Sequence, residues 1–133
     1  MCLNIHWWNR RPHVAKKDIV VYKMIVKDHW NSASKGFVTP HQFATVTIGE
    51  TYTSELQKIY SKWNKQWTIE QGLHSLVKLS TAKKLATSEG YHLAKCIIPK
   101  GSMYYRGKWQ TNEMGYVRGY ASSAIKYVEL INK

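Results

Sequence analysis

A single α+β domain is the fold that this 133-residue sequence predicts. Three observations predict it: the length is that of one domain with its own core, short apolar and β-branched runs are separated by turn residues, and only two segments have helical spacing. We expect a mixed or antiparallel sheet of about five to six short strands with one or two helices. This domain would span residues 18–133, after a basic, aromatic N-terminal arm over residues 1–17.

The first half of the domain predicts three strands and one helix. Residues 18–26 (DIVVYKMIV) are rich in β-branched residues and predict a strand, and a loop over 27–40 follows. Residues 43–48 (FATVTI) predict a second strand, and 51–53 a short third one. Apolar residues in 54–67 recur at roughly helical spacing, which favours an amphipathic helix packed on the sheet.

The second half begins with a short strand at 73–76 and a helix over 80–90 (STAKKLATSEG). Ser80 is suited to the N-cap, because its hydroxyl can accept a hydrogen bond from a free backbone N–H. Gly90 is suited to the left-handed position that ends many helices.

A strand and a turn follow the helix. Residues 93–98 alternate as a strand does, and Pro99 and Gly101 predict its end and a turn. We expect a further strand over 102–106, a polar loop over 107–119 and a closing strand over 122–131.

The charge and the aromatic residues of the chain favour a nucleic-acid partner. Twenty Lys and Arg residues against eight Asp and Glu residues give a net charge of +12 at pH 7. Such self-repulsion is costly in a small domain, and an anionic partner offsets it. Six Trp and nine Tyr against two Phe suit a surface that is partly buried and partly wet. A solvated basic surface and an acidic protein partner are the alternatives.

Aromatic and cationic residues are interleaved in three stretches, and this pattern suits single-stranded RNA. Aromatic rings stack on bases, and cations contact phosphates. The alternative is that these residues are ordinary surface or core, with at least one of the two arm Trp residues pinning the N-terminus to the core. The candidate contacts are Trp7, Trp8, Arg10, Arg11, Lys16, Lys17, Trp63, Lys65, Tyr104, Tyr105, Arg106, Lys108 and Trp109.

The sequence predicts no catalytic residue, no metal site and no cofactor. The six His residues lack the spacing of a zinc site, and no phosphate-binding, dinucleotide-binding or nucleophile-elbow motif occurs. Cys96 with His74 or His92 could form a nucleophile pair, but we expect a buried thiol, because reactive thiols need an electropositive, partly exposed setting. His74 is expected to be a partly buried histidine; a place in a cleft beside the 91–98 strand is the alternative.

The sequence favours a soluble protein of the cytoplasm without a membrane partner. Two Cys residues do not make a disulfide framework, which points to a reducing compartment. No stretch has the charged and apolar regions of a signal peptide. Apolar runs such as Met24–Val26 are far too short to span a bilayer.

Several short motifs resemble a family of small proteins encoded by bacteriophages and prophages. They are DIVVYKMI at 18–25, GETY at 49–52, IEQGLHSL at 69–76, AKCIIPKGSMYY at 94–105 and AIKYVELI at 124–131. The resemblance covers most of residues 18–131. It implies that the protein acts in the cytoplasm of a bacterial host.

A more distant similarity is to ADP-ribosyltransferases. In that fold a Gly-containing strand, a short Ala-containing helix and a strand that ends in a Gly turn follow one another. Residues 72–75, 82–86 and 94–101 have that order.

The catalytic set of that fold does not carry over. Its first-strand residue would fall near Tyr22 and Lys23, and its late-strand glutamate could only be Glu113 or Glu129, neither of which belongs to an ExE pair. The similarity implies at most a nucleotide-binding cleft, with Tyr22 and His74 as its candidate residues. An enzyme of this type would need Tyr22, His74 and one of the two glutamates to converge on one pocket.

Together these features predict a phage-encoded binding protein that inhibits a host defence nuclease, as anti-CRISPR proteins do. The partner would be RNA or the complex of RNA with the nuclease, and the protein would not be an enzyme. One alternative is an ADP-ribosyltransferase-like enzyme or a protein that binds a nucleotide signal. Another is a protein-interaction module for an acidic partner, anchored by Trp and Arg residues.

Overall fold

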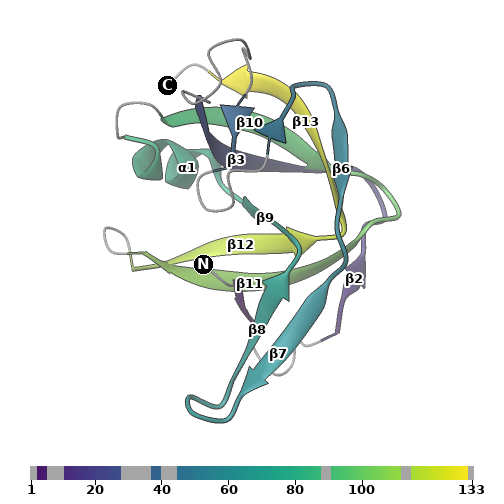
Figure 1. Cartoon of the computed structure of the whole chain (residues 1–133), viewed down its shortest axis with the longest axis vertical. Coiled ribbons are helices and arrows are strands. Elements are labelled where there is room, and N and C mark those ends of the chain that lie inside the picture. The colour runs from purple at the N-terminus through teal and green to yellow at the C-terminus, as the bar shows by residue number, and fades with distance from the viewer. Residues whose placement is uncertain are drawn as a thin grey trace.

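The computed structural model describes residues 3–5, 11–27, 37–39, 45–87, 91–111 and 115–131. In these ranges the chain is almost entirely β (Figure 1): thirteen strands belong to one sheet, and a single short helix, α1 (Leu79–Leu85), packs beside it. No helix in these ranges is long and apolar enough to cross a membrane.

The strands of the first half are β1 (Leu3–Ile5), β2 (His13–Val14), β3 (Ile19–Lys27), β4 (Phe37–Val38), β5 (Thr45–Val46), β6 (Thr51–Thr53) and β7 (Gln57–Ser61). Those of the second half are β8 (Gln66–Gln71), β9 (Leu73–Leu76), β10 (Tyr91–Ile98), β11 (Met103–Thr111), β12 (Gly115–Ser122) and β13 (Ala124–Ile131). Short connections join β6 to β7, β7 to β8, β8 to β9 and β12 to β13.

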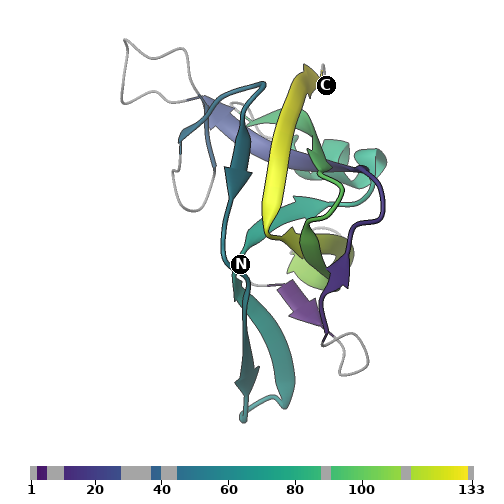
Figure 2. The ribbon, with the colours of Figure 1, turned by 90° about the vertical axis from the view of Figure 1, so that its right-hand side faces the viewer.

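The sheet is antiparallel at every described pairing and curls back on itself. Its main order is β6-β13-β10-β3-β9-β12-β11-β1-β8-β7, with β2 on β11 and the small β4–β5 pair on β3. The two strands at the ends of this order, β6 and β7, are joined by only three residues, 54–56. Because the connection is so short, the two ends of the sheet must lie near each other, and the twisted sheet is strongly curved (Figures 1 and 2).

The predicted α+β class with five to six strands and one or two helices is wrong. The chain is mostly β, with a single antiparallel sheet and one short helix in the described residues. Two segments account for most of the difference: the expected helix over 54–67 and the expected loop over 107–119.

The segment 54–67 contains a strand, a turn and the start of a second strand. β7 and β8 pair from Gln57↔Gln71 to Ser61↔Gln66, and residues 62–65 form the turn. Tyr60 lies opposite Trp67 with ring centroids 5.1 Å apart, a cross-strand aromatic pair that stabilises a hairpin. β8 also pairs with β1, so the sheet offers this segment more partners than a lone amphipathic helix would have. A short apolar run fits the helical period and the strand period about equally well. Pairing with other strands therefore determines that this segment forms a hairpin.

Residues 107–111 and 115–119 belong to two long strands, β11 and β12, which pair from Tyr104↔Ser122 to Thr111↔Gly115. The prediction of a loop rested on their polar and glycine content. Polar residues alternate there with Trp109, Val117 and Ala121, which are buried. That alternation is the pattern of a strand with one wet face.

The other expected elements agree with the structure to different degrees. The strands predicted over 18–26, 51–53, 73–76, 93–98 and 122–131 are confirmed as β3, β6, β9, β10 and β13, with ends shifted by up to two residues. The strand predicted over 102–106 is β11, which extends to Thr111. The strand predicted over 43–48 is described only at β5 and beyond it, and the predicted 27–40 loop contains β4.

The predicted helix over 80–90 is shorter and starts earlier. Lys78 is the N-cap of α1, and no side-chain hydrogen bond caps it, so Ser80 lies inside the first turn. Gly90 lies outside the described residues. Ala82 and Ala86 face the core, because small side chains let this helix approach β3 and β9 closely.

The core has two parts, on either side of the β3–β10 region. One gathers Leu3, Ile5, Ile69, Trp109 and the inner face of β11 and β12. The other gathers Val21, Ile25, Cys96, Ile98 and Tyr127. Residues 3–5 and 13–14, within the predicted arm, pair into the sheet, and Leu3 and Ile5 are fully buried.

Candidate functional site

The outer face of β11 and β12 carries cations and aromatic rings side by side. Residues directly opposite each other in an antiparallel pair lie on the same face of the sheet. The register places Lys108 opposite Arg118, and Arg106 opposite Tyr120. Tyr116 extends the same face and is 62% exposed. We call these five residues the cationic face: Arg106, Lys108, Tyr116, Arg118 and Tyr120.

The cationic face has no acidic residue to balance it. Arg106, Lys108 and Arg118 are all exposed, and no carboxylate belongs to this face within the described parts of β11 and β12. Like charges directly opposite on neighbouring strands destabilise a sheet. The Lys108–Arg118 pair is therefore a cost to the fold, which a bound anion would remove.

The aromatic end of this face is held in place by ring contacts. Tyr104 is buried between His13 and Tyr120, with ring centroids 5.4 and 5.3 Å away. The guanidinium of Arg106 lies 5.9 Å from the centre of the Tyr104 ring, and its Nη2 donates to the Tyr104 hydroxyl over 3.5 Å. That hydrogen bond raises the pKa of Arg106. Desolvation, and then the charge of Arg106, lower the pKa of His13, so the positive charge of this group sits on Arg106.

The same face continues across the sheet toward the β7–β8 hairpin. Lys108 is opposite Asn4, Asn4 is opposite Thr68, and Thr68 is opposite Ile59. The hairpin projects from the end of the molecule (Figures 1 and 2). Its turn carries Lys62, Trp63 and Lys65, all exposed, and Trp63 is 99% exposed. A Trp that has no packing contact in the free protein is free to stack on a partner.

The structure separates the residues that the sequence proposed as contacts. Arg106 and Lys108 belong to the cationic face, with Tyr104 buried beneath its edge, and Trp63 and Lys65 belong to the hairpin turn. Tyr105 and Trp109 point to the opposite face, where both are core residues. Exposed positions near β2 hold Arg11, Lys16 and Lys17. Outside the described residues lie Trp7, Trp8 and Arg10.

Three residues of the cationic face were not among the predicted contacts: Tyr116, Arg118 and Tyr120. They lie in or next to the segment that was expected to be a loop, and residues of a loop cannot be assigned to one face of a sheet. The alternation in Tyr116-Val117-Arg118-Gly119-Tyr120 is the signal that could have placed all three on one face.

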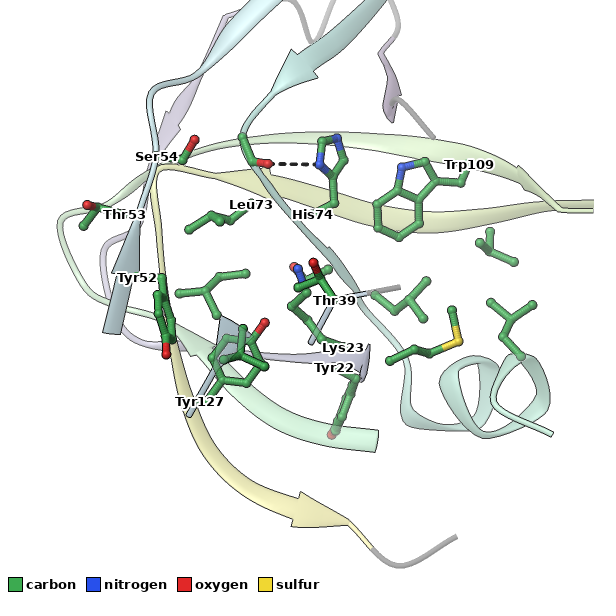
Figure 3. A pocket seen from close by; sticks show the side chains of 18 of the residues that line it. Tyr22, Lys23, Thr39, Tyr52, Thr53, Ser54, Leu73, His74, Trp109 and Tyr127 are labelled. Carbon is green, nitrogen blue, oxygen red and sulfur yellow. Dashed lines mark hydrogen bonds between the residues drawn. The ribbon is translucent and has the colours of Figure 1, made fainter. Parts of the chain in front are cut away.

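A second feature is a cavity of about 580 Å³ inside the curl of the sheet (Figure 3). It is lined from β3, β5, β6, β8, β9, β11, β12 and β13, with Thr39, Ser54 and, from α1, Leu85. Most of the side chains are apolar or aromatic, and Tyr22 and His74, the two predicted cleft residues, both line it. The volume is within the range of small-molecule sites.

His74 is held in one tautomer at the cavity wall. Its Nδ1 is 3.1 Å from the carbonyl oxygen of Gly72, so Nδ1–H donates and Nε2 carries the lone pair. Desolvation, and then the charge of Lys23, lower the pKa of His74 to about 4. The ring packs against Trp109 with centroids 5.7 Å apart. His74 Nε2, Trp109 Nε1 and Ser75 Oγ are buried without a hydrogen-bond partner among the described residues, and all three belong to cavity-lining residues.

Lys23 is the cation of the cavity. It stands on β3 between Val21 and Ile25, both fully buried, on the face that packs into the core. Desolvation lowers the pKa of Lys23 to about 8. Glu70, which also lines the cavity, is exposed, and no carboxylate among the described residues is within ion-pair distance of Lys23.

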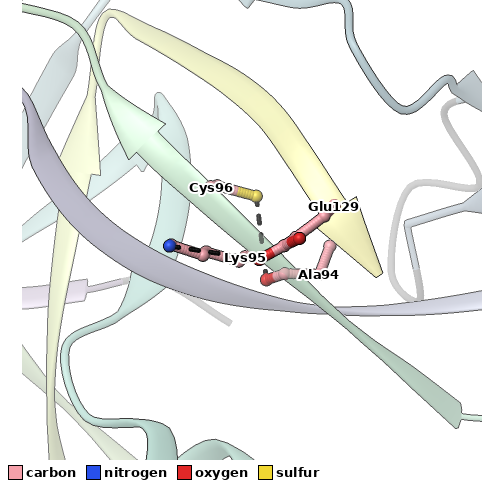
Figure 4. Close-up of polar contacts among 4 residues, drawn as sticks. All are labelled: Ala94, Lys95, Cys96 and Glu129. Atoms are coloured by element: carbon pink, nitrogen blue, oxygen red, sulfur yellow. Dashed lines mark hydrogen bonds and ion pairs between the residues drawn. The ribbon is translucent and has the colours of Figure 1, made fainter. Parts of the chain in front are cut away.

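Of the groups proposed for an enzyme, Tyr22 and His74 share the cavity, whereas Cys96 and Glu129 are not among its lining residues. Cys96 is buried, donates to the Ala94 carbonyl at 3.8 Å, and burial raises its pKa to about 12, so it is an unreactive thiol (Figure 4). Glu129 is not among the cavity-lining residues; it lies opposite Lys95 on the exposed surface, with a 4.0 Å ion pair (Figure 4). Glu113 lies outside the described residues.

Comparisons with protein-family models, curated proteins and solved structures gave no significant match. In the described part of the chain, no three His, Cys, Asp or Glu residues are placed to hold a metal ion. The arguments below therefore rest on the geometry of this chain alone.

Proposed function

We propose that the protein binds single-stranded nucleic acid, with RNA favoured, through the cationic face. The observation that carries the proposal is the Lys108–Arg118 pair, two like charges opposite each other with no carboxylate on their face of β11 and β12. A phosphate backbone running across the two strands would neutralise both. The exposed ring of Tyr116 beside them supplies a stacking surface for a base.

The hairpin turn extends the same interface. The strands that carry this face are neighbours in the sheet, in the order β12, β11, β1, β8 and β7. Lys62 and Lys65 add two cations, and Trp63 adds a second ring for stacking. A narrower form of the proposal is that this interface engages the RNA of a host defence nuclease and inhibits it. The net charge and the phage-like motifs support that form.

Removing the opposed cations should weaken RNA binding by at least about tenfold. The test is the double substitution Lys108→Gln and Arg118→Gln, with affinity for a fluorescent 12-nucleotide uridine strand measured by anisotropy at 100 mM salt. Tyr116→Ala should independently weaken binding by roughly fivefold or more, since base stacking contributes about 1–3 kcal/mol.

The matched control removes two exposed cations elsewhere. Lys83→Gln with Lys84→Gln on α1 changes the net charge by the same amount and should alter the affinity by less than about twofold. Equal losses in the two double variants would mean that only the overall charge matters. No binding by the wild-type protein would favour a protein partner for the same surface.

A further inference from the structure

We propose that the cavity is a binding site for a small carboxylate with an apolar, ring-sized body, held by Lys23. This site is separate from the cationic face: Lys23 and His74 line the inside of the curled sheet, whereas Lys108 and Arg118 point to its outer side. Binding at the cavity can therefore be tested separately from nucleic-acid binding.

The charge in the cavity argues for an anionic ligand. Lys23 lies between buried apolar residues with no carboxylate of the described chain in ion-pair range. An amine in such a place is costly unless it is paired, and core positions on strands are normally apolar. The cost is explained if the partner is a ligand.

The number of charges argues for a single negative charge. Of the Lys and Arg residues that the structure describes, only Lys23 lines the cavity. A carboxylate matches one ammonium, whereas the two charges of a phosphate monoester would leave one charge unbalanced. Of the acidic residues that the structure describes, only the exposed Glu70 lines the cavity.

The walls of the cavity define the rest of the ligand. The paired rings of His74 and Trp109 form one wall, and their Nε2 and Nε1 atoms are buried in that wall. The other walls carry Met24, Leu76, Val117 and Ile125, and the tyrosines Tyr52 and Tyr127. A flat apolar body would pack between these walls, whose rings are drawn in Figure 3.

The test compares two probes of nearly equal shape, 2-naphthoate and 2-naphthamide, by isothermal titration calorimetry. The wild-type protein should bind the carboxylate at least about tenfold more tightly than the amide, because only the carboxylate pairs with Lys23. Lys23→Met should remove most of that preference and leave amide binding within about threefold. Lys83→Met, on the exposed face of α1, should change neither affinity.

A second readout does not depend on the absolute affinity. The pKa of Lys23 is about 8 in the free protein, and a bound carboxylate raises it. At pH 8.5 the wild-type protein should therefore take up protons when it binds 2-naphthoate, seen as an enthalpy that varies with the buffer, and Lys23→Met should not.

Three results would overturn the proposal. The first is that 2-naphthoate at 1 mM does not bind the wild-type protein. A dissociation constant of 1 mM corresponds to a binding free energy of only about −4 kcal/mol, so even weak binding would be detected. The second is an equal loss for both probes in Lys23→Met. The third is displacement of 2-naphthoate by an equal concentration of AMP, which would assign the cavity to a doubly charged phosphate.

Discussion

Replacing Gly107 by alanine should destabilise the protein by about 2–3 kcal/mol, the cost of forcing extra atoms into a packed site. A β-carbon at this position would overlap the backbone oxygen of Asn4 and lie 2.7 Å from Leu3 Cγ. The overlap is with backbone on one side, so no rotamer change relieves it. β1 would have to move away from β11, and Leu3 and Ile5, both fully buried, would move with it.

The measurement is urea unfolding followed by tryptophan fluorescence. Gly49→Ala is the control: Gly49 has a left-handed backbone angle, φ 98°, which Gly107 does not have, and a β-carbon there meets nothing within 4 Å. The control should lose only about 1 kcal/mol, from the left-handed backbone alone. If Gly107→Ala were as stable as Gly49→Ala, β1 would not occupy the place between β8 and β11 described above.

Replacing Lys23 by methionine should stabilise the protein at pH 7. The change removes a desolvated charge that has no ion-pair partner among the described residues, and it keeps a side chain of similar length on the buried face of β3. The folded protein holds the pKa of Lys23 at about 8, against 10.5 in the unfolded chain. At about 1.4 kcal/mol per unit of pKa, the charged lysine costs up to about 3 kcal/mol.

The gain should depend on pH in a defined direction. Below about pH 8 Lys23 is charged in both states, and the full cost of burial is present. Between about pH 8 and 10.5 the unfolded chain binds a proton that the folded protein does not, so wild-type stability rises relative to Lys23→Met. The stability difference between the two proteins should therefore shrink across that window. Urea unfolding at pH 7, 8, 9 and 10 measures it.

Other titrating groups near Lys23 make the comparison of two proteins necessary. His74 and Tyr52 line the same cavity, as do Glu70 and Tyr127, and Cys96 of β10 also interacts with Lys23. Burial raises the pKa of Cys96 and of Tyr127, which lowers stability at high pH in both proteins. Subtraction removes most of this. A destabilised Lys23→Met at pH 7, or a difference that does not change with pH, would mean that Lys23 has a partner or is well hydrated.

The strands with strong local patterns could be predicted from the sequence, and the pairing that joins them could not. β3 and β10 have dense β-branched or alternating residues, and their ends were placed within two residues. β7 and β8 were missed because Leu56, Ile59, Tyr60 and Trp63 fit a helix as well as a hairpin. The choice depends on β1, which lies more than fifty residues earlier in the chain.

The candidate site was predictable by residue type and not by geometry. The sequence singled out Arg106 and Lys108 from their place in an aromatic-cationic run, but it included Tyr105 and Trp109, which face the core. Most of β12, the strand that pairs with β11 and carries Arg118, was assigned to a loop. The sequence therefore could not show that Arg118 lies opposite Lys108. Lys23 was noted only as a neighbour of Tyr22, because burial without a counter-charge is a property of the folded sheet alone.

The salt dependence of RNA binding tests the central claim most directly. The proposed interface holds five exposed cations: Arg106, Lys108 and Arg118 on the cationic face, and Lys62 and Lys65 in the hairpin turn. For a single strand, each phosphate contact contributes about 0.7 to the slope of log affinity against log salt, so five contacts predict a loss of about 100-fold between 50 and 200 mM. With Lys108→Gln and Arg118→Gln, three contacts remain and the loss should be only about 20-fold.

The two proteins should be measured with the same 12-nucleotide uridine strand across the salt series. A steep slope in the wild-type protein and a shallower one in the double variant would place the phosphates on β11 and β12. A wild-type affinity that ignores salt, or a slope that the double substitution leaves unchanged, would contradict the proposed interface.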